Sequence, residues 1–179
     1  MPQLLLSTFF GLFLWTFGGL YSAAPKSDGV VIVEDHQQIS SLKELTSRFK
    51  GKVLYIDIWA SWCGPCRREM TYNAALHDFV AGKEIELIYI SADDAADYAV
   101  WESFINKNDL RGQHLLAGED LMNDLTDQFY YRIKNGRKVM SLPTYLIIGK
   151  NGKILQRDAR RPSQGNALYR QLQKALKKK

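Results

Sequence analysis

Residues Val53–Cys66 read VLYIDIWASWCGPC, an apolar run followed by two cysteines with two residues between them. The first part, Val53–Ala60, is rich in β-branched and aromatic residues, which predicts a strand buried in the middle of a sheet. Pro65 suits the first turn of a helix, where its missing N–H leaves no hydrogen bond unmade. The stretch therefore predicts a buried strand that leads into a helix with Cys63 and Cys66 at its start.

Cysteines in this position are placed for redox chemistry. A thiol reacts as its thiolate, and the free N–H groups and positive dipole at a helix N-terminus stabilise that anion. With only two residues between them, the second sulfur can come close enough to the first to close a disulfide. We therefore predict that Cys63 and Cys66 are a redox-active pair, with Cys63 partly exposed and Cys66 more buried.

Two other uses of a C-x-x-C motif fit this chain less well. A zinc site would need two further ligands, and the chain has no other cysteine and only three scattered histidines, His36, His77 and His114. A purely structural disulfide of this spacing closes so small a loop that it constrains the unfolded chain little. We expect no metal at the cysteines, and we expect the histidines to be surface or packing residues.

Outside this stretch, strand and helix patterns alternate. The helix that follows the cysteines is expected to run to Gly82, with Tyr72 and Leu76 on its apolar side, and Val100 and Trp101 are expected on the apolar face of a later helix. Further strands are expected at 30–33, 85–90, 114–117, 144–148 and 153–157, and further helices at 41–51, 121–129 and 168–176. This order predicts an α/β domain with a mixed sheet.

The N-terminal segment is apolar, without a charged residue from Leu4 to Ala24. Residues 1–24 are therefore expected to be a signal peptide or an uncleaved membrane anchor, residues 25–29 a linker, and residues 30–179 the folded domain. Either route places the domain outside the cytoplasm, in the periplasm or cell envelope, where disulfide chemistry is permitted.

Composition narrows the function further. The chain has 179 residues, 46% of them hydrophobic, which is enough to build a core without a framework of disulfides. The formal charge is +5, with lysines gathered at the C-terminal end, where they can attract acidic surfaces or simply solvate the end of a helix. No basic patch interleaved with aromatic residues indicates nucleic acid, and we expect a monomer.

The segment VLYIDIWASWCGPC closely resembles the active site of the thioredoxin superfamily. Three further segments resemble the exported TlpA/ResA-like branch of that superfamily: RREM at 67–70, the block from about 85 to 131, and DARRPS at 158–163. The resemblance covers most of residues 30–179. It implies a thioredoxin fold, in which helices flank a central mixed β-sheet on both faces, with a strand–helix insertion.

The resemblance also implies catalytic roles. Cys63 would attack a substrate disulfide, and Cys66 would resolve the mixed disulfide that results. Asp57 would be a buried acid that moves the Cys66 proton, a task suited by the raised pKa that burial causes; alternatively it is an outward-facing strand residue. Glu69 matches an active-site glutamate of ResA-like proteins, or is a plain exposed helix residue.

Substrate binding is implied at two loops. Pro143 lies in SLPT at 141–144, where the family has a cis proline packed against the disulfide and a neighbour whose backbone pairs with the substrate chain. The alternative is an ordinary proline at the start of a strand. The residues expected to contact substrate are Trp62, Gly64, Pro65, Leu142, Pro143 and Thr144.

The chain departs from the family in two places. Family members usually have a proline five residues after the second cysteine, and this chain has Thr71 there. The helix is therefore expected to kink less than in those relatives. The stretch KNGRK at 134–138 is longer and more basic than usual. It either shapes substrate choice or is the solvated tip of a hairpin.

These observations predict a thiol–disulfide oxidoreductase, acting as a reductase on protein disulfides and needing no metal, nucleotide or flavin. A membrane or periplasmic redox partner would restore the dithiol, and cytochrome c maturation or thiol repair are the implied settings. One alternative is a copper-binding chaperone, although such proteins usually space their cysteines more widely and add a histidine ligand. Another is a net disulfide oxidase, which only the reduction potential separates from a reductase.

Overall fold

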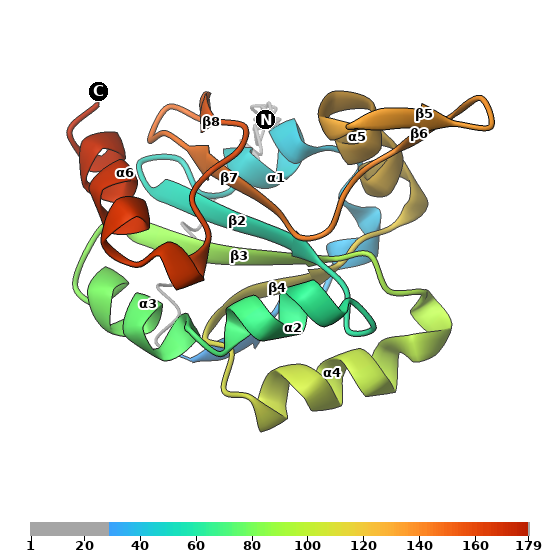
Figure 1. The fold of residues 1–179 in the computed structure, drawn as a ribbon, viewed down its shortest axis with the longest axis horizontal. Coiled ribbons are helices and arrows are strands. Elements are labelled where there is room, and N and C mark those ends of the chain that lie inside the picture. Colours follow the sequence, from blue (N-terminus) through green and yellow to red (C-terminus); the bar gives the residue numbers. More distant parts are fainter. Residues whose placement is uncertain (1–28, 179) are drawn as a thin grey trace, which may run out of the picture.

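The computed structural model describes residues 29–178, which fold around a six-stranded sheet with strand order β1-β4-β3-β2-β7-β8 (Figure 1). The strands are β1 (Val30–Ile32), β2 (Val53–Trp59), β3 (Ile85–Ser91), β4 (Gly112–Leu116), β7 (Thr144–Ile148) and β8 (Ile154–Gln156). The neighbouring pairs β1–β4, β4–β3 and β3–β2 are parallel, whereas β7 runs antiparallel to both β2 and β8. The predicted mixed sheet is confirmed, and every residue of the central strand β2 is buried.

Helices cover both faces of the sheet (Figure 1). On one face lie α1 (Leu42–Ser47) and α5 (Glu119–Phe129); on the other lie α2 (Gly64–Met70), α3 (Asn73–Val80), α4 (Tyr98–Lys107) and α6 (Asn166–Leu176). Short 3-10 turns are η1 (His36–Gln38), η2 (Ala95–Asp97) and η3 (Pro162–Gln164). Alternate residues of β2 therefore enter two separate hydrophobic clusters, with Ile56 and Ile58 on the α1/α5 side and Tyr55 and Trp59 on the other.

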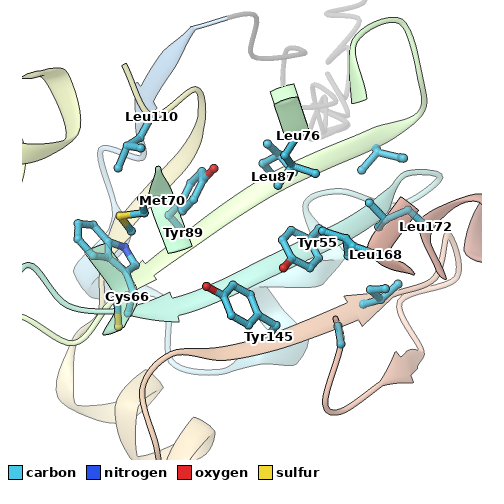
Figure 2. Packing of buried hydrophobic residues seen from close by; sticks show 14 of the residues in the cluster. Tyr55, Cys66, Met70, Leu76, Leu87, Tyr89, Leu110, Tyr145, Leu168 and Leu172 are labelled. Atoms are coloured by element: carbon cyan, nitrogen blue, oxygen red, sulfur yellow. The ribbon is translucent and has the colours of Figure 1, made fainter. Parts of the chain in front are cut away.

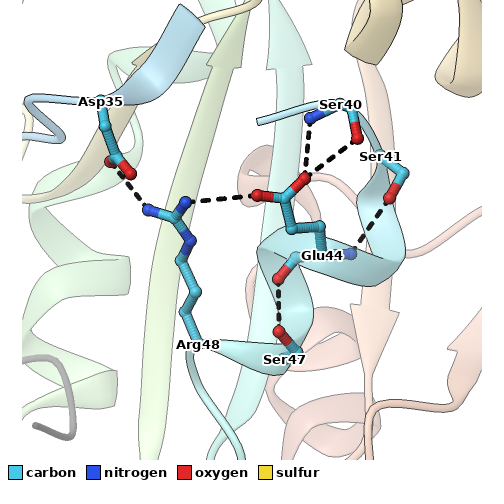
Figure 3. Close-up of polar contacts among 6 residues, drawn as sticks. All are labelled: Asp35, Ser40, Ser41, Glu44, Ser47 and Arg48. Carbon is cyan, nitrogen blue, oxygen red and sulfur yellow. Dashed lines mark hydrogen bonds and ion pairs between the residues drawn. The ribbon is translucent and has the colours of Figure 1, made fainter. Parts of the chain in front are cut away.

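The start of α1 is stabilised by side-chain hydrogen bonds (Figure 3). The Ser41 hydroxyl accepts a hydrogen bond from the Glu44 backbone N–H at 3.2 Å, as expected for a helix cap. The Glu44 carboxylate accepts from both the backbone N–H and the hydroxyl of Ser40, one residue earlier than in a capping box, and also binds Arg48. The helix ends at Ser47, a few residues before the expected end near Gly51, whose φ of +88° suits a turn.

The prediction of a single long helix after the cysteines is wrong. The structure has two helices, α2 and α3, because the chain turns at Thr71 and Tyr72 without a proline. The Thr71 hydroxyl donates to the Arg68 carbonyl at 2.8 Å, and the Tyr72 N–H donates to the Glu69 carbonyl three residues back, so the helix tightens and stops. The expectation that Thr71 would leave the helix less kinked is wrong for the same reason.

Two hydrophobic residues that were expected on buried helix faces, Tyr72 and Val100, are exposed instead. Tyr72 lies at the turn between α2 and α3 and is 51% exposed, because it precedes the first helical residue of α3. Val100 is 60% exposed, because the buried stripe of α4 consists of Trp101 and Ile105, four residues apart. Both errors come from placing the helical face by sequence alone.

The basic stretch at 134–138 is the tip of a second, two-stranded sheet made by β5 (Arg132–Lys134) and β6 (Arg137–Val139). Asn135 and Gly136 connect the strands with φ values of +50° and +72°. Two residues with positive φ are typical of the tight hairpin turns that match the twist of the strands. This hairpin, residues 131–139, projects from the domain beyond α5 (Figure 1).

The expected signal peptide or anchor at 1–24 and most of the expected linker lie outside the described residues. Within residues 29–178, no helix has the length and apolar character that crossing a membrane requires.

Candidate active site

Cys63 and Cys66 form a disulfide at the start of α2, with an S–S distance of 1.98 Å. Cys63 is the N-cap residue, and its sulfur accepts a hydrogen bond from the Cys66 backbone N–H at 3.2 Å. The predicted pair is thus confirmed as a disulfide held where a helix N-terminus can stabilise a thiolate.

The two sulfurs differ in access to solvent. Cys66 is fully buried, and Cys63 is 5% exposed, so Cys63 is more covered than expected although the predicted order holds. Cys63 lines an open pocket together with its neighbour Trp62 and with Tyr131 and Leu142 from distant parts of the chain. Trp62 is 66% exposed and forms an apolar rim beside the disulfide.

Asp93 clamps the loop that precedes the cysteines, a role that was not predicted from sequence. It is 4% exposed and accepts hydrogen bonds from the Ser61 backbone N–H at 2.8 Å and the Ser61 hydroxyl at 2.7 Å. The Ser91 hydroxyl also donates to it. The only feature of the sequence that could have indicated this contact is the position of Asp93 just after β3, since the Ser61 loop comes just after β2. These two strands are parallel neighbours, so their carboxyl ends meet at one edge of the sheet.

Asp93→Ala should therefore lower the free energy of unfolding by about 3 kcal/mol, because it leaves the buried Ser91 donor and the partly buried Ser61 donors without their acceptor. Urea denaturation of the oxidised protein measures this loss. The matched control is Asp94→Ala, at an exposed neighbour, which should change stability by no more than about 0.5 kcal/mol. An equal effect of the two substitutions would contradict the clamp.

Asp57 lies in the middle of a polar row across the sheet. It pairs in register with Tyr89 of β3 on one side and Tyr145 of β7 on the other, and Tyr89 pairs with His114 of β4. Residues directly opposite one another on paired strands share a face, so this row lies under α2. Figure 2 shows Cys66, Tyr89 and Tyr145 together on this side of the sheet. Asp57 is 2% exposed, so it is not an outward-facing strand residue.

Burial raises the pKa of Asp57 well above its ordinary value, and the negative charge of Glu69 adds to the rise. The Tyr145 hydroxyl opposes part of this shift, although it is not aligned for a regular hydrogen bond. One Asp57 carboxylate oxygen, Oδ1, has no hydrogen-bond partner within the protein. A buried carboxyl without full hydrogen bonding is costly as an anion, so this group holds a proton far more readily than a surface aspartate.

The second predicted loop also lies at the site. The Leu142–Pro143 peptide bond is cis, as expected, and Pro143 is buried. Leu142 lines the same pocket as Cys63, while Pro143 and Thr144 line a second depression that continues from it. Gly64 and Pro65 are exposed beside Cys63. The structure therefore brings the two predicted substrate-binding loops to one surface.

Glu69 has a specific partner rather than a free carboxylate. It accepts hydrogen bonds from the backbone N–H and the hydroxyl of Ser163, both at 3.0 Å, and so joins α2 to η3. Glu69 thus braces the helix that carries the cysteines. Within residues 29–178, no group of three or more His, Cys, Asp or Glu side chains is arranged to hold a metal ion.

The Redoxin family model matches residues 23–172. The chain is 31% identical over 130 residues to the thiol-disulfide oxidoreductase ResA of Bacillus thuringiensis subsp. konkukian; the match covers 73% of this chain and 65% of that relative. The chain thus spans just under two thirds of the length of this relative.

Solved structures of thiol-disulfide oxidoreductases are also similar to this chain. A candidate thiol-disulfide oxidoreductase from Bacteroides vulgatus is 34% identical, with a TM-score of 0.50, over 65% of this chain and 69% of that one. The thioredoxin domain of a thiol-disulfide oxidoreductase from the same organism is 24% identical, with a TM-score of 0.55, over 72% of this chain and 81% of that one. The fold is therefore thioredoxin-like, with the β5–β6 hairpin as an addition. The chain belongs to the Redoxin family and is similar to ResA and other thiol-disulfide oxidoreductases over most of its length.

Proposed function

We propose that this chain reduces disulfides in other proteins outside the cytoplasm, using the Cys63–Cys66 pair. The observation that carries the proposal is the disulfide at the N-terminus of α2, whose Cys63 side lines a surface pocket while Cys66 is fully buried. A large substrate can reach only the sulfur on the pocket side, so Cys63 is assigned as the nucleophile. The apolar run from Leu4 to Ala24 supports export or anchoring in the cell envelope.

The reaction begins from the reduced pair. The Cys63 thiolate attacks one sulfur of a substrate disulfide, forming a mixed disulfide and releasing the other substrate sulfur as a thiolate that takes up a proton. The ionised form of Asp57 then accepts the Cys66 proton, and the Cys66 thiolate attacks the Cys63 sulfur. The second substrate sulfur leaves and is protonated. Two electrons and two protons pass from the Cys63–Cys66 dithiol to the substrate, and the protein is left as its disulfide.

The raised pKa of Asp57 suits this proton transfer. A carboxyl with an ordinary pKa would be a poor base for a thiol near neutral pH, whereas a buried carboxyl whose pKa is raised is closer to the thiol. A dithiol redox partner must then reduce the pair again, because the chain carries no other cysteine. We propose a membrane or periplasmic protein in that role.

Reduction of insulin disulfides tests the activity. With dithiothreitol as electron donor, the protein should precipitate the insulin B chain faster than dithiothreitol alone, and Cys63→Ser should return the rate to that background. A Cu(I) titration of the reduced protein separates the rival function. Stoichiometric, tight copper binding without acceleration of insulin reduction would replace the proposal with a copper chaperone.

A further inference from the structure

The β5–β6 hairpin carries three cations on one of its faces. Arg132 and Lys134 are two residues apart on β5, and Lys134 lies directly opposite Arg137 of β6, so the three side chains share a face. All three are exposed. The hairpin is therefore a short arm with a concentrated positive charge.

This charge is not neutralised by the described part of the chain. Within residues 29–178, none of these three cations forms an ion pair, whereas Lys138, on the other face of the hairpin, pairs with Asp127 of α5 at 2.9 Å. Like charges directly opposite each other on paired strands destabilise a hairpin. The Lys134–Arg137 pair is thus an arrangement that an external anion would stabilise.

The hairpin is continuous with the active site. Tyr131, which leads into β5, lines the pocket of Cys63 and also the depression beside it, and the Arg132 guanidinium lies 4.8 Å from the centre of the Tyr131 ring. After β6, the chain runs through Met140 and Leu142, which line the same pocket. Whatever the arm binds is therefore held next to the disulfide.

We propose that this cationic face, Arg132, Lys134 and Arg137, binds an acidic segment of the substrate polypeptide that lies close in sequence to the disulfide being reduced. The inference rests on the proposed reductase function and deepens it. A polypeptide fits better than a lipid surface because the cations adjoin the exposed Tyr131 ring and the sulfur pocket, which together offer charge, aromatic contact and the reacting atom. Charge complementarity of this kind raises association rates and selects partners.

Two synthetic peptides test the proposal. Both contain the same intramolecular disulfide, flanked in one by glutamates and in the other by glutamines. The full-length reduced protein should reduce the glutamate peptide with a kcat/KM about tenfold higher at low ionic strength. The preference should fade as added salt shortens the screening length from about 30 Å at ~0.01 M to about 3 Å at ~1 M.

The hairpin variant Arg132→Gln/Lys134→Gln/Arg137→Gln should lose the preference while reducing the glutamine peptide as fast as the wild type. Its matched control removes three exposed cations from α6 and its end, Arg170→Gln/Lys174→Gln/Lys178→Gln, and should keep the preference. Reduction of the glutamine peptide also shows that each variant is folded and active.

Several results would overturn the inference. Equal reduction of both peptides by the wild type rejects the acidic-segment proposal and leaves the reductase function standing. A preference that survives in the hairpin variant assigns it to other residues. Equal peptide reduction combined with hairpin-dependent binding to phosphatidylglycerol vesicles assigns the cations to a membrane. Failure to reduce either peptide rejects the proposed function itself, and this inference with it.

Discussion

Cys66→Ser should turn the protein into a trap that stays joined to its substrate through Cys63. The Cys63 sulfur lines the pocket and can still attack, but the buried residue that should displace it has lost its thiol. The mixed disulfide should then accumulate to a near-stoichiometric amount, while multiple turnover falls to the uncatalysed background. Non-reducing electrophoresis with a disulfide substrate, followed by mass spectrometry of the joined cysteines, measures both effects.

The paired variant Cys63→Ser is the control for this experiment. It should form no mixed disulfide, because Cys66 is fully buried beneath the start of α2. Alkylation of the reduced wild-type protein should agree, with Cys63 modified first. A substrate trapped on Cys66, or faster labelling of Cys66, would reverse the assigned roles of the two cysteines.

Asp57→Asn should stabilise the protein at neutral pH while slowing its turnover. The unfolded carboxyl loses its proton near its ordinary pKa of 3.8, whereas burial keeps the folded carboxyl protonated to a much higher pH. Between these two pKa values folding takes up a proton, so wild-type stability falls by up to about 1.4 kcal/mol for each unit of rising pH. Asparagine does not titrate. The gain in unfolding free energy of Asp57→Asn over the wild type should therefore be absent below pH 3.8 and grow as the pH rises above it.

Urea denaturation of the wild-type and variant proteins across this pH range measures the gain. Asp94→Asn, at an exposed aspartate, is the matched control and should leave the pH dependence unchanged. Turnover of Asp57→Asn should drop most near neutral pH, because Cys66 has lost the group that accepts its proton. Parallel stability curves for wild type and variant would show that folding does not raise the pKa of Asp57. Unchanged kinetics would remove it from the mechanism.

Much of the architecture could be predicted because it depends on local patterns. The apolar run at Val53–Ala60 has too few polar residues for any place but the middle of a sheet, and the strand β2 lies there. The cysteine spacing, Pro65 and the helix that follows are likewise properties of neighbouring residues, and the disulfide and the helix cap are both present. Alternation along β2 puts Asp57 on the face opposite Ile56 and Ile58.

The sequence by itself thus determined the central strand, most of the order of strands and helices, and the redox pair, because periodicity and cysteine spacing act over a few residues. The buried acid Asp57 was implied by the resemblance to the thioredoxin superfamily. Only the tertiary structure decided which side chains surround them. Asp93 meets Ser61 across 32 residues of chain because β2 and β3 are parallel neighbours. Tyr145 faces Asp57 because β7 pairs with β2 in one particular register. Tyr131 and Leu142 line the same pocket as Cys63 because the hairpin and the loop before β7 return to the start of α2. Such contacts depend on how distant segments pair and pack, which local patterns do not specify.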